Sequence, residues 1–285
     1  MSAAALALVL PSAVAHATWN MLAKRSNGGL PYVWLAGAMS SLLMVPVVIG
    51  VALAGEAHMK PEAVPWMVAS GAIHIGYYTM LQRGYGSGDL SVVYPLARGT
   101  GPLLATVGAV VILSESPSAL TLLGAGAILS AIMLIGLSAL RRSAHQRRAA
   151  LYALATGAFI ATYTLWDKHG VDGLGTSPVV YLFGGEVVRT AVMLPLALRR
   201  REETLFEWRE HRTEVMGNAV LAPISYGLFL SALALAPVSA VAPLRECGIL
   251  LGVVLGGQLL SEPDTGRRAL AAAAMIVGIA ALASG

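Results

Sequence analysis

The sequence of 285 residues is poor in charge, because Asp, Glu, Lys and Arg make up 12% of it, against about 25% in a soluble domain. Apolar residues make up 56% and the mean hydropathy is +0.71, which indicates an integral membrane protein and leaves almost nothing for a soluble domain. The single cysteine, Cys247, excludes an internal disulfide and a multi-cysteine metal site.

A helix crosses a bilayer with about 20 predominantly apolar residues. The sequence contains ten such spans, at 3–23, 31–54, 64–82, 90–113, 118–139, 149–167, 177–198, 215–236, 238–260 and 268–284. The first span could pass for a secretory signal, but it lacks a basic start and a second copy of it occurs in mid-chain. We therefore predict an all-α integral membrane protein with ten transmembrane helices.

The first span carries His16, Trp19 and Asn20, which share one helical face at spacings of i, i+3 and i+4. The sixth span repeats the pattern, with Tyr163 in place of the tryptophan and Lys168 at its end, as a lysine ends the first. We expect this polar aromatic face to look into the protein. For the histidine, a helix-packing role and a substrate contact are both open.

The fourth and ninth spans also share a pattern, since Ser91–Gly99 recurs as Ser239–Cys247 with serine, valine and proline at the same places. Each segment holds charge inside an apolar span: Arg98 in the fourth, Arg245 and Glu246 in the ninth. At 1.5 Å per residue, both arginines lie about 11–12 Å deep. Such charges are costly in hydrocarbon and indicate function.

Other charges favour structural interpretations. Glu115 and Glu262 each follow one of these two spans, just before a proline, and so look like helix-end residues. Glu186 and Arg189 lie at i and i+3 on one span, where we expect them to neutralise one another. The charged segment Arg199–Glu214 predicts a short surface helix.

The remaining basic residues fall in short loops, where they report orientation and not nucleic-acid binding. Fourteen of them follow odd-numbered spans: Lys24, Arg25, Arg83, Arg141, Arg142, Arg147, Arg148, Arg199, Arg200, Arg201, Arg209, Arg212, Arg267 and Arg268. The opposite side has two, Lys60 and Lys168. The count predicts a multi-pass protein of the cell (inner or plasma) membrane, with the Arg141–Arg148 loop cytoplasmic and both termini outside.

The doubled order of these features resembles the drug/metabolite transporter superfamily, EamA type. The features are five spans per half, an aromatic and polar face closed by lysine, a proline in each fourth span and Ser-Glu after it. The resemblance implies a first repeat at 1–140, a basic connecting loop at 141–148 and a second repeat at 149–285. Family members are expected to have cytoplasmic termini, and here the loop charges indicate the reverse.

Because five spans are an odd number, the second repeat must enter the membrane upside down, as in alternating-access transporters. The resemblance further implies a cavity lined by spans one, three, four, six, eight and nine. Carried onto this chain, it indicates a substrate-binding set of Arg245, Glu246, Arg98, His16, Trp19, Asn20, His74, Tyr78, Tyr163 and Tyr226.

We therefore expect a secondary transporter, an exporter or exchanger, for a small organic anion or zwitterion such as an amino acid, a phosphonate or a phosphorylated metabolite. The arginines favour carboxylate or phosphate groups. We expect no cofactor, no metal, no nucleic-acid partner and no enzymatic activity, and either a monomer or a homodimer in the bilayer. Two alternatives stay open: a membrane enzyme acting on a phosphate-bearing lipid, and a membrane scaffold that transports nothing.

Overall fold

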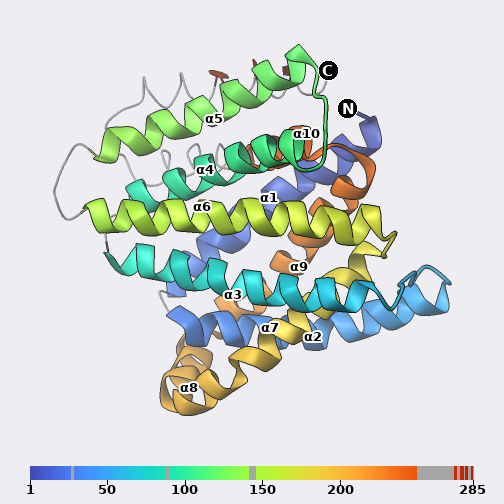
Figure 1. Ribbon diagram of the computed structural model, residues 1–285. Coiled ribbons are helices and arrows are strands. Elements are labelled where there is room, and N and C mark those ends of the chain that lie inside the picture. Colours follow the sequence, from blue (N-terminus) through green and yellow to red (C-terminus); the bar gives the residue numbers. More distant parts are fainter. Residues whose placement is uncertain are drawn as a thin grey trace.

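The computed structural model describes residues 1–26, 29–87, 90–140 and 146–248, together with positions 273, 274, 277, 278, 280, 281 and 284 of the last predicted span. The described part is all helical (Figure 1). The first half contains α1 (Ala3–Ser26), α2 (Gly29–Leu53), α3 (Ala63–Ser87), α4 (Leu90–Val111) and α5 (Ala119–Leu140). The second contains α6 (Gln146–Lys168), the π-helical turn η1 (His169–Gly173), α7 (Pro178–Arg199), α8 (Arg201–Glu210), α9 (Arg212–Leu235) and α10 (Val238–Arg245).

The first eight predicted spans coincide with long helices, and the short surface helix predicted within Arg199–Glu214 is confirmed as α8. Five of the described helices are long and apolar enough to cross a membrane. The predicted ninth span begins at Val238 as expected, and its positions 249–260 lie outside the described residues. The seven described positions of the tenth span are helical, whereas Glu262 and residues 141–145 are outside the described part.

The helices of the two halves are interleaved. In Figure 1, α1 and α6 run in opposite directions. Helix α1 packs against α9 and α3 packs against α6, so each half places its first helix on a later helix of the other half. Helices α2 and α7 also meet, as do α4 and α10. This is how two inverted halves would pack, and the inverted repeat and its boundaries stay a prediction.

Close backbone contacts fix α1 against the second half. Ser12 Oγ donates to the Ser225 carbonyl oxygen at 2.7 Å and Ser225 Oγ donates back to the Ser12 carbonyl at 2.9 Å. Just after α10, a Cβ on Gly248 would lie 2.3 Å from the Ala13 carbonyl oxygen. Only glycine therefore fits there, and its lack of a side chain lets the two backbones approach closely.

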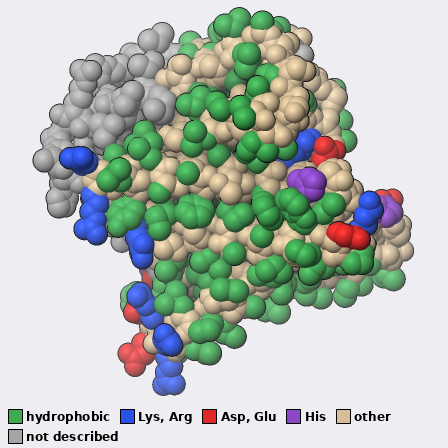
Figure 2. Space-filling view, viewed as in Figure 1, with side chains coloured by type: hydrophobic (Ala, Val, Ile, Leu, Met, Phe, Trp, Pro, Cys, Tyr) green, Lys and Arg blue, Asp and Glu red, His purple; other side chains and the backbone are tan. Residues whose placement is uncertain are grey.

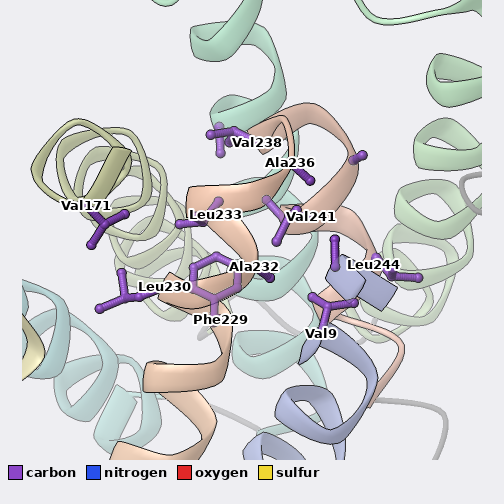
Figure 3. Packing of buried hydrophobic residues seen from close by; sticks show 14 of the residues in the cluster. Val9, Val171, Phe229, Leu230, Ala232, Leu233, Ala236, Val238, Val241 and Leu244 are labelled. Carbon is purple, nitrogen blue, oxygen red and sulfur yellow. The ribbon is translucent and has the colours of Figure 1, made fainter. Parts of the chain in front are cut away.

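The largest apolar cluster surrounds the junction of α9 and α10 (Figure 3). Phe229, Leu230 and Leu233 of α9 belong to it together with Val241 and Leu244 of α10, and each is at most 1% exposed. The lone cysteine, Cys247, belongs to the same cluster and is 7% exposed, as expected for a small core residue. This packing fixes the end of α10, where two of the predicted site residues lie.

The outer surface has a basic edge and a broad apolar region. Lys and Arg side chains gather at the left edge of Figure 2, where Figure 1 shows α3 and α7 ending and α6 beginning. Large apolar side chains cover the helices between the two ends, and some are highly exposed, such as Leu53 at 85% and Val111 at 74%. A multi-pass membrane protein needs such a surface, because lipid tails cover it in the bilayer.

Candidate functional site

A cavity of about 70 Å³ lies between the two halves of the molecule. Seven helices line it: α1, α2 and α3 from the first half, and α6, α7, α9 and α10 from the second. Every lining residue is buried or partly buried. The family resemblance predicts the contributions of α1, α3, α6, α9 and α10, but not those of α2 and α7, and the expected contribution of α4 is absent among the described lining residues.

Seven of the ten predicted site residues line this cavity, namely His16, Trp19, His74, Tyr78, Tyr163, Tyr226 and Arg245. The other three, Asn20, Arg98 and Glu246, form a separate polar cluster behind His16 and are not part of the described lining. The helical face predicted in the first span is therefore divided. His16 and Trp19 face the cavity with their rings edge to face at 5.0 Å, and Asn20 turns toward α4.

The separate cluster is an ion pair between the halves. Arg98 Nη1 lies 3.5 Å from Glu246 Oε1, and both side chains are 3% exposed. Arg98 Nη2 also lies 3.4 Å from Asn20 Oδ1, and Asn20 Nδ2 donates to the His16 carbonyl oxygen at 2.7 Å. Glu246 thus pairs with an arginine of the other half and not with its chain neighbour Arg245. Adjacent residues of a helix do not face each other, so the carboxylate and guanidinium point to different neighbours.

Arg245 instead contacts a neutral partner. Its Nη2 donates to His16 Nδ1 at 3.0 Å, and its guanidinium carbon lies 4.2 Å from the centre of the Phe229 ring and 5.3 Å from that of Tyr226. A guanidinium can only donate hydrogen bonds, so His16 Nδ1 must accept. In the neutral imidazole the proton is then on Nε2, and His16 presents a second N–H donor.

Two of these donors are left without acceptors. Arg245 Nε and His16 Nε2 are both buried, and neither has a hydrogen-bond partner among the described residues. Buried polar groups are almost always paired, and an exception requires an explanation such as a missing ligand. Both atoms carry protons, so the missing group must be an acceptor.

Aromatic rings form most of the remaining wall. The His74 ring stacks on Tyr163 with centroids 4.3 Å apart and meets Tyr226 edge to face at 5.3 Å. His74 Nδ1 lies 2.9 Å from the Ser70 carbonyl oxygen, which fixes the ring. Such a wall offers apolar contact area to a solute while the donors near Arg245 fix its polar end.

The pair predicted on the seventh span is confirmed, because Arg189 Nη2 is bonded to Glu186 Oε1. The Arg189 guanidinium also lies 4.7 Å from the centre of the Tyr78 ring. Both charged residues also line the cavity, which the sequence analysis did not predict. Because the two charges neutralise each other, this pair adds no net charge to the cavity wall.

Several polar residues of the site region were missed, among them Asp167, Tyr181 and Asn218. Tyr181 and Asn218 line the cavity, and Asp167 lies behind it with no exposed surface. The signal for Asp167 was present, because it is an acidic residue next to the lysine that ends an apolar span. No three His, Cys, Asp or Glu side chains of the described residues converge as a metal site would need.

Helix α10 is positioned by the first half. Glu115, in the segment after α4, accepts the backbone N–H groups of Val238 at 2.7 Å and Ser239 at 3.0 Å. These are among the N–H groups that a helix leaves without internal partners. The structural role expected for Glu115 is confirmed, but the helix that it caps is α10, not the helix that follows it.

Comparisons with known proteins agree with the fold. Residues 147–284 match the EamA-like transporter family. A crystal structure that shares 16% identity aligns with 97% of this chain and 98% of its own, with a TM-score of 0.74, which shows a common fold. None of the curated proteins matches the chain.

Proposed function

We propose that the chain is a secondary transporter for a small organic anion or zwitterion, working by alternating access, because its residues 147–284 match the EamA-like transporter family. The cargo carries a carboxylate, phosphate or phosphonate group that binds at Arg245 and His16. The rest of the solute lies against His74, Tyr163 and Tyr226.

The observation that carries the proposal is the pair of buried donors, Arg245 Nε and His16 Nε2, which have no partner in the part of the chain that the structure describes. An oxyanion has several lone pairs and matches the planar donor set of a guanidinium better than a neutral group does. Among the described residues, Arg245 has no carboxylate within ion-pair distance, although it is only 5% exposed. A bound anion would supply both the missing charge and the missing acceptors.

The size of the cavity supports a small cargo. Its volume of about 70 Å³ has room for roughly five water molecules, at ~10–15 Å³ for each. Pockets for drug-sized ligands are larger, at about 300–1,000 Å³. A cavity lined only by buried and partly buried residues fits the closed state through which an alternating-access transporter must pass.

For the orientation, we propose that the basic end of the bundle faces the cytoplasm at the cell membrane, which places both termini outside. The described arginines that favour this assignment lie at one end of the helices (Figure 2). A reporter that is active only in the cytoplasm, fused after Gly285, should be inactive. An active fusion would reverse the orientation.

A screen of the purified full chain tests the function. We expect amino acids, sugar phosphates or aminophosphonates to raise its unfolding temperature, by mass action, and their neutral analogues not to do so. The selected solute should then cross the membrane of liposomes that contain the protein without being changed chemically. A solute that emerges hydrolysed would favour a lipid-phosphate enzyme instead, and the absence of both shift and flux would favour a scaffold.

A further inference from the structure

Asp167, near the end of α6, is a carboxylate with no exposed surface and only neutral partners. Tyr181 of α7 donates its hydroxyl to Asp167 Oδ1 at 2.9 Å, and Tyr226 of α9 donates to Oδ2. The Ser70 hydroxyl of α3 is a third neighbour. Three helices of the second half and one of the first therefore meet at a single buried acid.

The other buried carboxylates within the described membrane spans are neutralised. Glu186 is bonded to Arg189, and Glu246 lies 3.5 Å from Arg98. No cation of the described residues lies within ion-pair distance of Asp167. An unpaired carboxylate inside a membrane is expensive and marks a functional group.

The neighbouring charged groups are engaged elsewhere. Lys168, the next residue, donates to the Leu233 carbonyl oxygen at 2.5 Å and pairs with Asp172 at 3.0 Å. The lysine thereby donates a hydrogen bond to a carbonyl oxygen near the end of α9. Its positive charge does not neutralise Asp167. On η1, the His169 ring stacks on Trp66 at 4.2 Å.

On α3, His74 stacks on Tyr163 and has its Nδ1 beside the Ser70 carbonyl oxygen. On α10, Arg245 lies on the other side of the Tyr226 ring, 5.3 Å from its centre. None of these groups offers a charge to the aspartate directly. A proton is then the simplest cation that can neutralise it.

The hydrogen bonds around Asp167 fit both of its protonation states. The Tyr181 hydroxyl has a second acceptor, the Trp66 carbonyl oxygen, at 3.3 Å. When Asp167 is ionised, Tyr181 donates to it. When Asp167 is protonated, its own O–H can donate to the Tyr181 oxygen while Tyr181 donates to Trp66, and Tyr226 remains a donor in both states. Asp167 gains one proton and the Tyr181 hydroxyl rotates, and no buried group of this cluster loses its hydrogen-bond partner.

We propose that Asp167 binds a coupling proton, and that Tyr226 links its protonation to occupation of the anion site. This rests on the proposed transport function. Tyr181 and Tyr226 line the cavity, so the acid lies one hydrogen bond behind the cavity wall. The Tyr226 ring also contacts the Arg245 guanidinium, which places the proposed cargo and proton sites on two sides of one side chain.

Infrared spectroscopy of the full chain in lipid nanodiscs tests the proton site without any cargo. Acidification should produce, reversibly, the band of a protonated carboxyl group, and Asp167→Asn should lose it. Asp172→Asn is the matched control, because this carboxylate lies on the next turn and is half exposed. It should keep the band. Tyr181→Phe, which removes the switching hydroxyl, should shift the band, and this covers the case in which Asp167→Asn does not fold.

A wild-type spectrum without a reversible band, or a band that Asp167→Asn retains and Tyr181→Phe does not shift, would overturn the proton site.

Coupling is tested in liposomes with the anion that gives the largest thermal shift. A proton gradient should drive its accumulation by the wild type and by Asp172→Asn, and this response should be lost in Asp167→Asn. An equal response in Asp167→Asn, or accumulation driven by sodium and not by protons, would contradict the coupling. The thermal-shift screen tests the anion site separately. The infrared experiment requires no solute, and the screen requires no proton gradient, so the two proposals can fail independently.

Discussion

Arg98 and Arg245 lie in corresponding spans of the two halves and are equally buried, at 2% and 5% exposure, but their partners differ. Arg98 is held by Glu246, Asn20 and Tyr77. Arg245 has a neutral histidine and two aromatic rings. Depth and burial therefore do not separate a structural arginine from a binding one. The charge of the neighbouring side chain distinguishes the two, because a guanidinium that is already paired with a carboxylate binds a further anion weakly.

The Glu186–Arg189 pair sharpens this distinction, because it faces the same cavity as Arg245. Its guanidinium is neutralised on its own helix. Under the proposed function, the anionic end of the cargo therefore binds at Arg245 of α10 and not at Arg189 of α7. The predictions below test this division, beginning with the largest effect.

Replacing Arg98 by Gln should destabilise the fold the most. The change leaves Glu246 charged, buried and unpaired, which costs about 3–5 kcal/mol. The measurement is unfolding of the purified variant in detergent. The double variant with Glu246→Gln should recover most of the lost stability, and a double variant that remains as unstable as Arg98→Gln would remove the ion pair from the account.

Replacing Arg245 by Gln should act on binding and not on folding. No carboxylate of the described residues depends on Arg245, so we expect a smaller loss of stability than for Arg98→Gln. The lost charged hydrogen bonds, at about 1.5–3 kcal/mol, should weaken anion binding about 10- to 150-fold. Isothermal titration measures this loss. Arg245→Lys should recover little of it, because an ammonium lacks the planar donor pair.

His16 should contribute a smaller part of the same site. Its replacement by Phe keeps the ring contact with Trp19 but removes the Nε2 donor, a loss of about 0.5–1.5 kcal/mol in anion binding. Gln, which keeps one donor and one acceptor, should retain part of the affinity. Equal affinity of the wild type and His16→Phe would mean that His16 only packs against Arg245, the other interpretation that the sequence left open.

The smallest effect is expected at Glu115, which caps α10 from the other half. Its replacement by Ala should cost about 1 kcal/mol of stability, as for other helix caps. Because α10 carries Arg245, anion affinity should fall slightly as well. Exposed Glu210, at the end of α8, provides a control. Its replacement by Ala should change neither quantity.

The sequence predicted the helices well, because each long helix is an apolar run between charged or turn-forming residues. The end of α2 illustrates this, where Gly55 takes a φ of +76° and donates its N–H to the Ala52 carbonyl. The cavity residues His16 and Trp19 were also predictable, since helical periodicity places them on one face.

Partners across helices were not predictable in the same way. The neighbours Arg245 and Glu246 look like a pair in the sequence, and only the packing of α10 between α1 and α4 sends them to different partners. The hydroxyl cluster around Asp167 is likewise assembled from four helices far apart in the chain. Spacing along one helix carries no information about such contacts.

The most direct test of the anion site compares matched solutes that differ in one oxyanion, such as serine with ethanolamine and 2-aminoethylphosphonate with ethanolamine. The measurement is the unfolding temperature of the wild type and of Arg245→Gln. We predict that at least one acidic member stabilises the wild type, by about 2.7 kcal/mol at 100 times its Kd, and that Arg245→Gln loses this shift at the same concentration. Equal stabilisation of both proteins, or by both members of every pair, would contradict the assignment of Arg245 as the anion site.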